Sequence, residues 1–133
     1  MATIKNTEVG IISINNYAIE KLVIKNLLKK RNLIILTNKK GKPIVTKGIR
    51  LKPSDYVSAV EITEYEDKLF IKIYFIIEFG ISINKETNKI FDMIERDFEN
   101  IGLDKPTQIT AKITGVKSKQ TAKRELEVVR RNE

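Results

Sequence analysis

The sequence KLFIKIYFIIEFGISINKETNKIFDMIERDFENIGLDKPTQITAKITGV, at residues 68–116, decides the fold that this chain is expected to adopt. Its first part alternates apolar residues with a period of two, which is typical of a β-strand with one buried face. The apolar face consists of Leu69, Ile71, Ile73, Phe75, Ile77 and Phe79. The opposite face is mixed in polarity, so a central strand at 68–79 with helices on one side is predicted.

A helix is expected to follow this strand at residues 84–101, with Asn84 as its N-cap. Its apolar residues fall on one stripe of a 3.6-residue period. They are Phe91, Ile94, Phe98 and Ile101. Gly102 stands where a helix commonly ends in a left-handed residue, and Pro106 prevents continuation. Alternating polarity then predicts a strand at 107–114.

The N-terminal half predicts a similar succession of elements. A short apolar strand at 9–14 is followed by a helix at 15–30 that Asn15 caps. Short strands are expected at 33–37 and 56–65, and Glu66 and Asp67 form the turn into the central strand.

These elements predict an α+β domain in the order β-α-β-β-β-α-β. We expect a two-layer sandwich, in which a mixed or mostly antiparallel sheet of about four strands carries two helices on one face. The sheet strands are 9–14, 56–65, 68–79 and 107–114. The single domain spans 9–116, between a flexible N-terminus at 1–8 and a charged C-terminal tail at 117–133. The tail is expected to be a frayed helix or a disordered segment.

The composition argues against an enzyme. The chain has 133 residues, no Cys and no His, so it lacks thiolate chemistry, the usual general base and the commonest metal ligand. No cofactor or metal site is expected. Its longest apolar run is too short for a membrane span, and no signal peptide is recognisable, so a cytoplasmic protein is expected.

The formal net charge of +8 is distributed unevenly. Residues 1–52 contain 12 Lys and Arg against 2 Asp and Glu, whereas residues 53–101 contain 5 against 11. Residues 102–133 again carry a positive balance, with 8 against 4. Such an asymmetry favours an anionic partner, such as nucleic acid or an anionic membrane surface, or self-association between opposite patches.

A basic segment without acidic residues, at 39–52, is the strongest candidate for binding an anionic partner. Its cations are Lys39, Lys40, Lys42, Lys47, Arg50 and Lys52. A solvated loop that keeps the protein soluble is the alternative interpretation. The element order is also similar to that of KH domains, which bind RNA, but these require a GxxG loop, and none is present.

Four apolar or aromatic residues are candidates for an interface. Ile24 and Leu28 widen the apolar arc of the first helix beyond what one sheet face requires. Phe70 and Tyr74 lie on the mixed face of the central strand, where they could pack on another subunit or stack on bases. A deeply buried first helix and a covered sheet face are the alternatives.

From residue 69 onward the sequence resembles the alkaline shock protein family, the Gls-type general stress proteins of Gram-positive bacteria and their relatives. An apolar strand ends in Phe79-Gly80, ISI follows at 81–83, and an amphipathic helix leads to Gly102-Leu103 and then to Gly115-Val116. The segment GIISINNYAIEKLV at 10–23 is similar to the family's first strand and helix. The segment KNLLKKRNLIIL at 25–36 differs from the family pattern.

This resemblance implies a non-enzymatic cytoplasmic protein linked to cell-envelope homeostasis or stress. Members of the family self-associate, and some lie under the membrane through an integral-membrane anchor partner. We therefore expect a structural or adaptor protein that forms homo-oligomers. The second hypothesis is a small basic nucleic-acid-binding module that uses the basic segment at 39–52 and the basic C-terminal tail.

Overall fold

The computed structural model describes residues 2–3, 13–44 and 52–132 of the chain. In chain order the elements are β1 (Ala2–Thr3), β2 (Ser13–Ile14), α1 (Asn16–Leu28), β3 (Ile34–Leu36), the 3₁₀ helix η1 (Pro53–Ala59), β4 (Val60–Tyr65), β5 (Lys68–Glu78), α2 (Ile83–Asn100), β6 (Gln108–Lys117) and β7 (Thr121–Arg131). The α+β class is confirmed.

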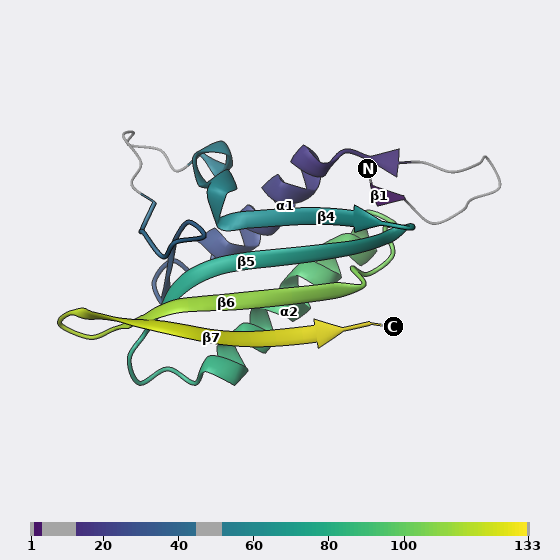
Figure 1. The fold of residues 1–133 in the computed structure, drawn as a ribbon. Helices are drawn as coiled ribbons and strands as arrows, with labels where there is room; N and C mark the ends of the chain where they lie inside the picture. Colours follow the sequence, from purple (N-terminus) through teal and green to yellow (C-terminus); the bar gives the residue numbers. More distant parts are fainter. Residues whose placement is uncertain (1, 4–12, 45–51, 133) are drawn as a thin grey trace.

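Strand β5 is the centre of a five-stranded mixed sheet (Figure 1). β3 and β4 both pair antiparallel with β5, β3 with its second half and β4 with its first. β6 runs parallel to β5 along its other edge, and β7 pairs antiparallel with β6. The parallel pair requires a crossover, which α2 supplies.

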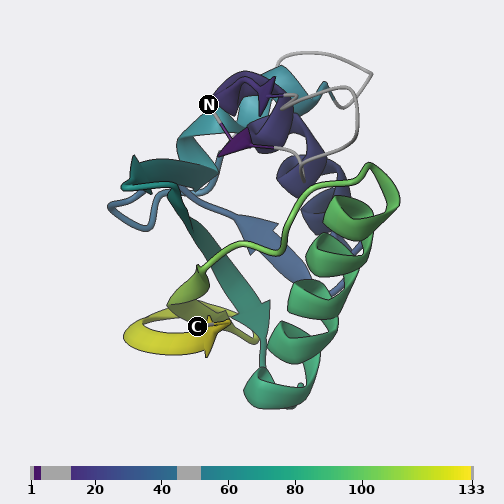
Figure 2. The same cartoon turned by 90° about the vertical axis from the view of Figure 1, so that its right-hand side faces the viewer.

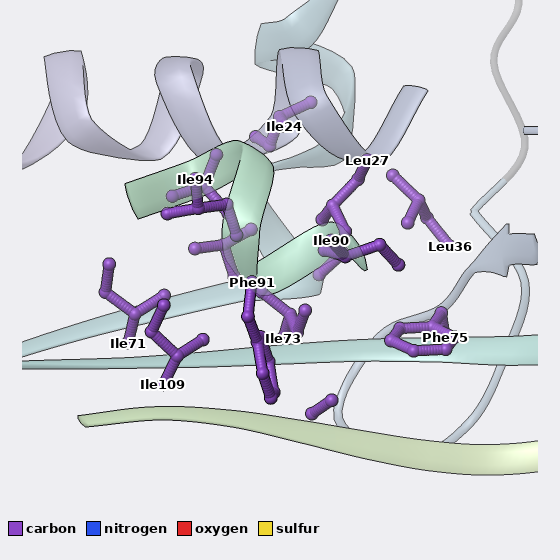
Figure 3. Close-up of a cluster of buried hydrophobic side chains, with 14 of the residues drawn as sticks. Ile24, Leu27, Leu36, Ile71, Ile73, Phe75, Ile90, Phe91, Ile94 and Ile109 are labelled. Carbon is purple, nitrogen blue, oxygen red and sulfur yellow. The ribbon is translucent and has the colours of Figure 1, made fainter. Parts of the chain in front are cut away.

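Helices α1 and α2 cover one face of this sheet and leave the other without a helical layer (Figure 2). The core lies between the two layers, where side chains from α1, α2 and β5 meet (Figure 3). Ile73 and Phe75 of β5 are fully buried, as are Phe91 and Ile94 of α2. The predicted two-layer sandwich with both helices on one face is therefore confirmed.

Capping groups set the helix boundaries. The Asn15 side chain accepts a hydrogen bond from the Ala18 amide at 2.9 Å, which confirms it as the cap of α1. Helix α2 begins one residue earlier than predicted, because Ser82 and not Asn84 is its cap and accepts from the Lys85 amide. At its end, Gly102 adopts a positive φ of 82°, as predicted.

The N-terminal strand of the sheet was predicted wrongly. Ser13–Ile14 pair with Ala2–Thr3 in a separate two-stranded sheet, while residues 4–12 lie outside the described part. The place on the β5 edge belongs instead to β3. The strand predicted from residue 56 begins only at Val60, because Pro53 starts the 3₁₀ helix η1.

The expectation for the C-terminal segment was also wrong. Residues 121–131 form neither a frayed helix nor a disordered tail but strand β7, which pairs with β6 over its whole length. Local propensity was a poor guide, because the backbone hydrogen bonds of a strand come from a neighbouring strand and not from the segment itself.

Three residues of the predicted apolar patterns are placed differently. Phe79 is 74% exposed and Ile101 is 45% exposed, because both follow the last residue of their element. Ile24, a candidate interface residue, is completely buried in the core. Leu28 packs partly buried against the same core.

Candidate functional site on the open face of the sheet

The face of the sheet opposite the helices carries the candidate site. β5 places Phe70, Lys72 and Tyr74 on this face, since the residues that alternate with them, such as Ile71 and Ile73, belong to the core. The strand register sets Lys112 of β6 beside Tyr74, and Glu127 of β7 beside Lys112. Strands β5, β6 and β7 therefore contribute to this surface, and the turn after β3 adds a fourth segment.

The turn at residues 38–43 folds against this face. Asn38 orders it, because its side-chain oxygen accepts from the amides of Lys40 and Lys42 at 2.9 and 3.1 Å. A bridge between Thr37 and Pro43 closes its base. Gly41 has a φ of +86°, and a β-carbon there would lie 3.3 Å from that of Thr114. The turn thus lies directly on β6 and presents its lysines at the open face.

A hydroxyl pair fixes the turn to the sheet. The Thr37 and Thr114 hydroxyls are 3.0 Å apart, and the Thr114 hydroxyl also donates to the Phe75 carbonyl. Thr37 is completely buried, so its hydrogen bonds are protected from water. β6 carries an irregularity here, because its register shifts after Ile113. Such bulges re-aim neighbouring side chains.

Between this turn and β7 lies a cavity of roughly 350 Å³, which we call the basic hollow. It is lined by Lys39, Lys72, Tyr74, Lys112, Ile113, Thr114, Arg124, Glu125 and Leu126. Four of these nine residues are cations and one is acidic. A second, smaller hollow of roughly 250 Å³ lies on the same face and shares Lys72, with Phe70 and Glu61 in its lining.

One cation of the basic hollow is already paired. The Lys112 ammonium lies 2.9 Å from the Glu127 carboxylate. This hydrogen bond, against a smaller opposing effect of burial, holds the pKa of Glu127 below its usual range, and the charges of Lys112 and Lys72 add to it. Glu127 is therefore ionised at neutral pH and compensates Lys112. Within the described part of the chain, Lys39, Lys72 and Arg124 form no ion pair with a carboxylate.

Tyr74 belongs to the floor of the basic hollow but is only 5% exposed. Burial raises its pKa to about 12, and the Glu61 carboxylate, through its charge and a hydrogen bond from the phenol, adds to the shift. The ring therefore supports the face and offers little area for stacking.

A pH prediction follows from Tyr74. A folded-state pKa raised above the unfolded value gives stability that is complete below about pH 10 and is lost as the pH rises through about 12. We expect the free energy of unfolding of the Tyr74→Phe variant to decline less over this range than that of the unmodified protein. Urea unfolding at pH 8, 10 and 11 would measure the difference. Parallel declines in the two proteins would contradict the assignment.

The residues predicted to bind anions are only partly brought together. Lys39, Lys40 and Lys42 are exposed on the turn, and Lys39 lines the basic hollow. Lys52 is exposed beside η1 and does not line this hollow. Lys47 and Arg50 lie outside the described residues.

Sequence reasoning missed Lys72, Lys112 and Arg124 as members of one site. Each stands in a different strand, and their meeting depends on the parallel pairing of β5 with β6 and on the pairing of β7. The alternation of β5 places Lys72 on the mixed face, which was the one available signal.

The residues that the structure describes contain neither a metal-binding cluster nor a membrane-spanning helix. No three acidic side chains gather there in a way that could hold a metal ion. No helix of these residues combines the length and the apolar composition needed to cross a bilayer.

Comparison with known proteins gives no relative. No family profile, no curated protein and no solved structure matches this chain. The resemblance to the alkaline shock protein family therefore stays an expectation drawn from the sequence alone.

Proposed function

We propose that this protein is a non-enzymatic adaptor that acts through self-association and protein partners. The observation that carries the proposal is strand β7, an edge strand of 11 residues. In the described part of the chain it pairs with β6 alone. The backbone groups on its outer edge are therefore available to another strand.

The side chains of β7 favour pairing with a second copy of the same strand. Leu126 and Val129 are 39% and 37% exposed, and both would lose contact with water against a partner strand. The cations Lys123 and Arg124 precede the acids Glu125 and Glu127. An antiparallel copy would run this pattern in reverse and would bring opposite charges together.

The cellular role follows from the resemblance described above. Proteins similar to the alkaline shock family are expected in the cytoplasm, where they support the cell envelope under stress. A membrane-anchor protein or an anionic membrane surface would then hold the oligomer in place. The exposed lysines of the turn at 38–43 are suited to such a surface.

Self-association can be tested by placing charges on the β7 edge. We expect the Leu126→Lys/Val129→Lys variant to be a monomer at concentrations where the unmodified protein forms dimers or larger species. Two buried ammonium groups would oppose pairing and weaken it by at least about tenfold. Size-exclusion chromatography with light scattering measures the mass at low and high salt.

A matched control removes exposed apolar residues elsewhere. Tyr65 and Ile101 are 65% and 45% exposed and do not belong to β7. The Tyr65→Lys/Ile101→Lys variant should keep the mass of the unmodified protein. The proposal is wrong if the unmodified protein is a monomer at every concentration, or if both variants lose self-association equally.

A further inference from the structure

We propose that the basic hollow and the β6–β7 hairpin tip form a binding site for a single strand of nucleic acid, held by its phosphate backbone. This inference goes beyond the adaptor function. It shares Arg124 and Glu125 of β7 with that proposal and adds Lys39, Lys72 and Lys112. The nucleic-acid hypothesis drawn from the sequence used the 39–52 segment and the basic C-terminal tail; the folded chain joins parts of both to Lys72 and Lys112 on one surface.

The first support is the convergence of cations from four elements. Lys39 comes from the turn, Lys72 from β5, and Lys112 and Arg124 come from β6 and β7. Like charges repel at such proximity, so their gathering costs stability unless an anion is present. Glu127 forms an ion pair with Lys112 and its charge also acts on Lys72, while among the described residues that line the hollow Glu125 is the one carboxylate against four cations.

The second support is the charge of the hairpin that continues from the hollow. Residues 117–124 read KSKQTAKR, with four cations and no acid, and all eight are exposed. In Figure 1 this hairpin extends beyond the rest of the sheet. The turn at 38–43 adds three more lysines without an acid. A nucleic-acid strand that extends out of the hollow would thus contact further cations on the hairpin and on the turn.

The shape of the site favours a nucleic-acid strand over a lipid surface. The four cations line a recess of roughly 350 Å³ and are not spread over a flat surface, which is the form that suits a layer of lipid headgroups. A flexible single strand can place phosphates inside such a recess, whereas a rigid duplex is too wide for it. Because Tyr74 is buried, little base stacking is expected. Binding should be largely independent of sequence and strongly dependent on salt.

The test uses fluorescence anisotropy with a labelled single-stranded RNA of about 20 nucleotides and mixed sequence. The Lys39→Gln/Arg124→Gln variant removes two cations of the hollow, one from the turn at 38–43 and one from β7. We expect its affinity at about 50 mM salt to be weaker by about tenfold, and its salt slope to be smaller by about 1.4. Both side chains are exposed, so the variant should fold normally, which circular dichroism would check.

The control variant Lys25→Gln/Lys105→Gln removes the same charge from exposed positions on α1 and on the loop before β6. It should bind the RNA within about twofold of the unmodified protein, because neither lysine lines the hollow, while the net charge is the same as in the test variant. A third variant, Glu125→Gln, removes the acid of the lining and should bind about twofold to threefold more tightly.

Three results would overturn the proposal. Equal weakening in the test and control variants would show attraction by net charge and no defined site. Binding to vesicles that contain phosphatidylserine, with no binding to the RNA, would assign the cations to a membrane. Failure of the unmodified protein to bind the RNA at about 50 mM salt would exclude the site. Light scattering checks the mass of each RNA-binding variant, because Arg124 and Glu125 lie in β7, the strand through which self-association is proposed.

Discussion

The Phe75→Ala variant is expected to lose about 3–5 kcal/mol of unfolding free energy, whereas Phe79→Ala should change it by less than about 0.5 kcal/mol. The two residues are four apart on the same apolar alternation of the sequence. Phe75 is completely buried between β5 and the helices, while Phe79 is 74% exposed beyond the end of the strand. Removal of the Phe75 ring leaves a cavity in the centre of the core, which the surrounding sheet cannot close.

Urea unfolding followed by circular dichroism would measure both variants. The Phe75 variant should unfold at a clearly lower urea concentration with little change in the slope of the transition. If it does not fold, Phe75→Leu, with an expected cost of about 1–2 kcal/mol, provides a measurable substitute. A large loss in the Phe79 variant would contradict the end of β5 at Glu78.

The second large effect is expected at Arg130, where the Arg130→Ala variant should lose about 2–4 kcal/mol. Arg130 joins the C-terminal strand to α2. Its guanidinium lies 2.6 Å from the Asp92 carboxylate and 3.1 Å from that of Glu95, and it donates to the Asn88 side chain at 2.7 Å. It also lies over the ring of Phe91.

The loss of unfolding free energy in Arg130→Ala arises mainly from the Glu95 carboxylate, which stays buried without its partner. Glu95 is 7% exposed, so its carboxylate would keep little contact with water and would retain only the hydrogen bond from the Asn132 side chain. Donation to three different side chains together with stacking on Phe91 needs a planar guanidinium, so Arg130→Lys should recover only part of the stability.

Arg131 provides the matched control. It is the next residue on β7, is exposed, and donates one long hydrogen bond of 3.3 Å to Gln108. Arg131→Ala should change the free energy of unfolding by less than about 0.5 kcal/mol. Thermal and urea unfolding of the three variants would measure the difference. Similar effects of the two alanine substitutions would contradict a special role of Arg130 in joining β7 to α2.

The same contacts explain part of the charge asymmetry of the chain. Arg130, from the basic C-terminal segment, pairs with the acidic helix α2, and Lys30 of the N-terminal half lies 3.4 Å from Glu86. The opposite patches therefore neutralise each other partly within one chain. In the described part of the chain, Lys39, Lys72 and Arg124 of the basic hollow stay outside these ion pairs.

Strands and helices whose apolar residues recur with a regular period were predictable from the sequence. The alternation at β5 and the helical stripe of α2 each report their buried face, because burial of that face is what selects the pattern. The turn at Glu66 and Asp67 was also predictable and is confirmed by the positive φ of both residues. Ser82 and Asn84 are both good caps, so the sequence left the start of α2 uncertain by one turn or less.

The candidate site was less accessible to sequence reasoning. The lysines of the 38–43 turn stand out as a cluster in the sequence, but their neighbours Lys72, Lys112 and Arg124 are 30 to 90 residues away. A site composed of single residues from separate strands has no local pattern. Only the pairing of the strands defines it.

The sequence by itself determined the fold class, the core face of the central strand and the two helices that cover it, because these depend on local periodicity and caps. The tertiary structure alone decided the placement of β3, the conversion of the charged C-terminal segment into β7, and the gathering of cations on the open face. A strand obtains its hydrogen-bond partners from distant residues, so its place in a sheet is settled by the whole chain. For the same reason the C-terminal edge and the basic hollow beside it exist only in the folded protein.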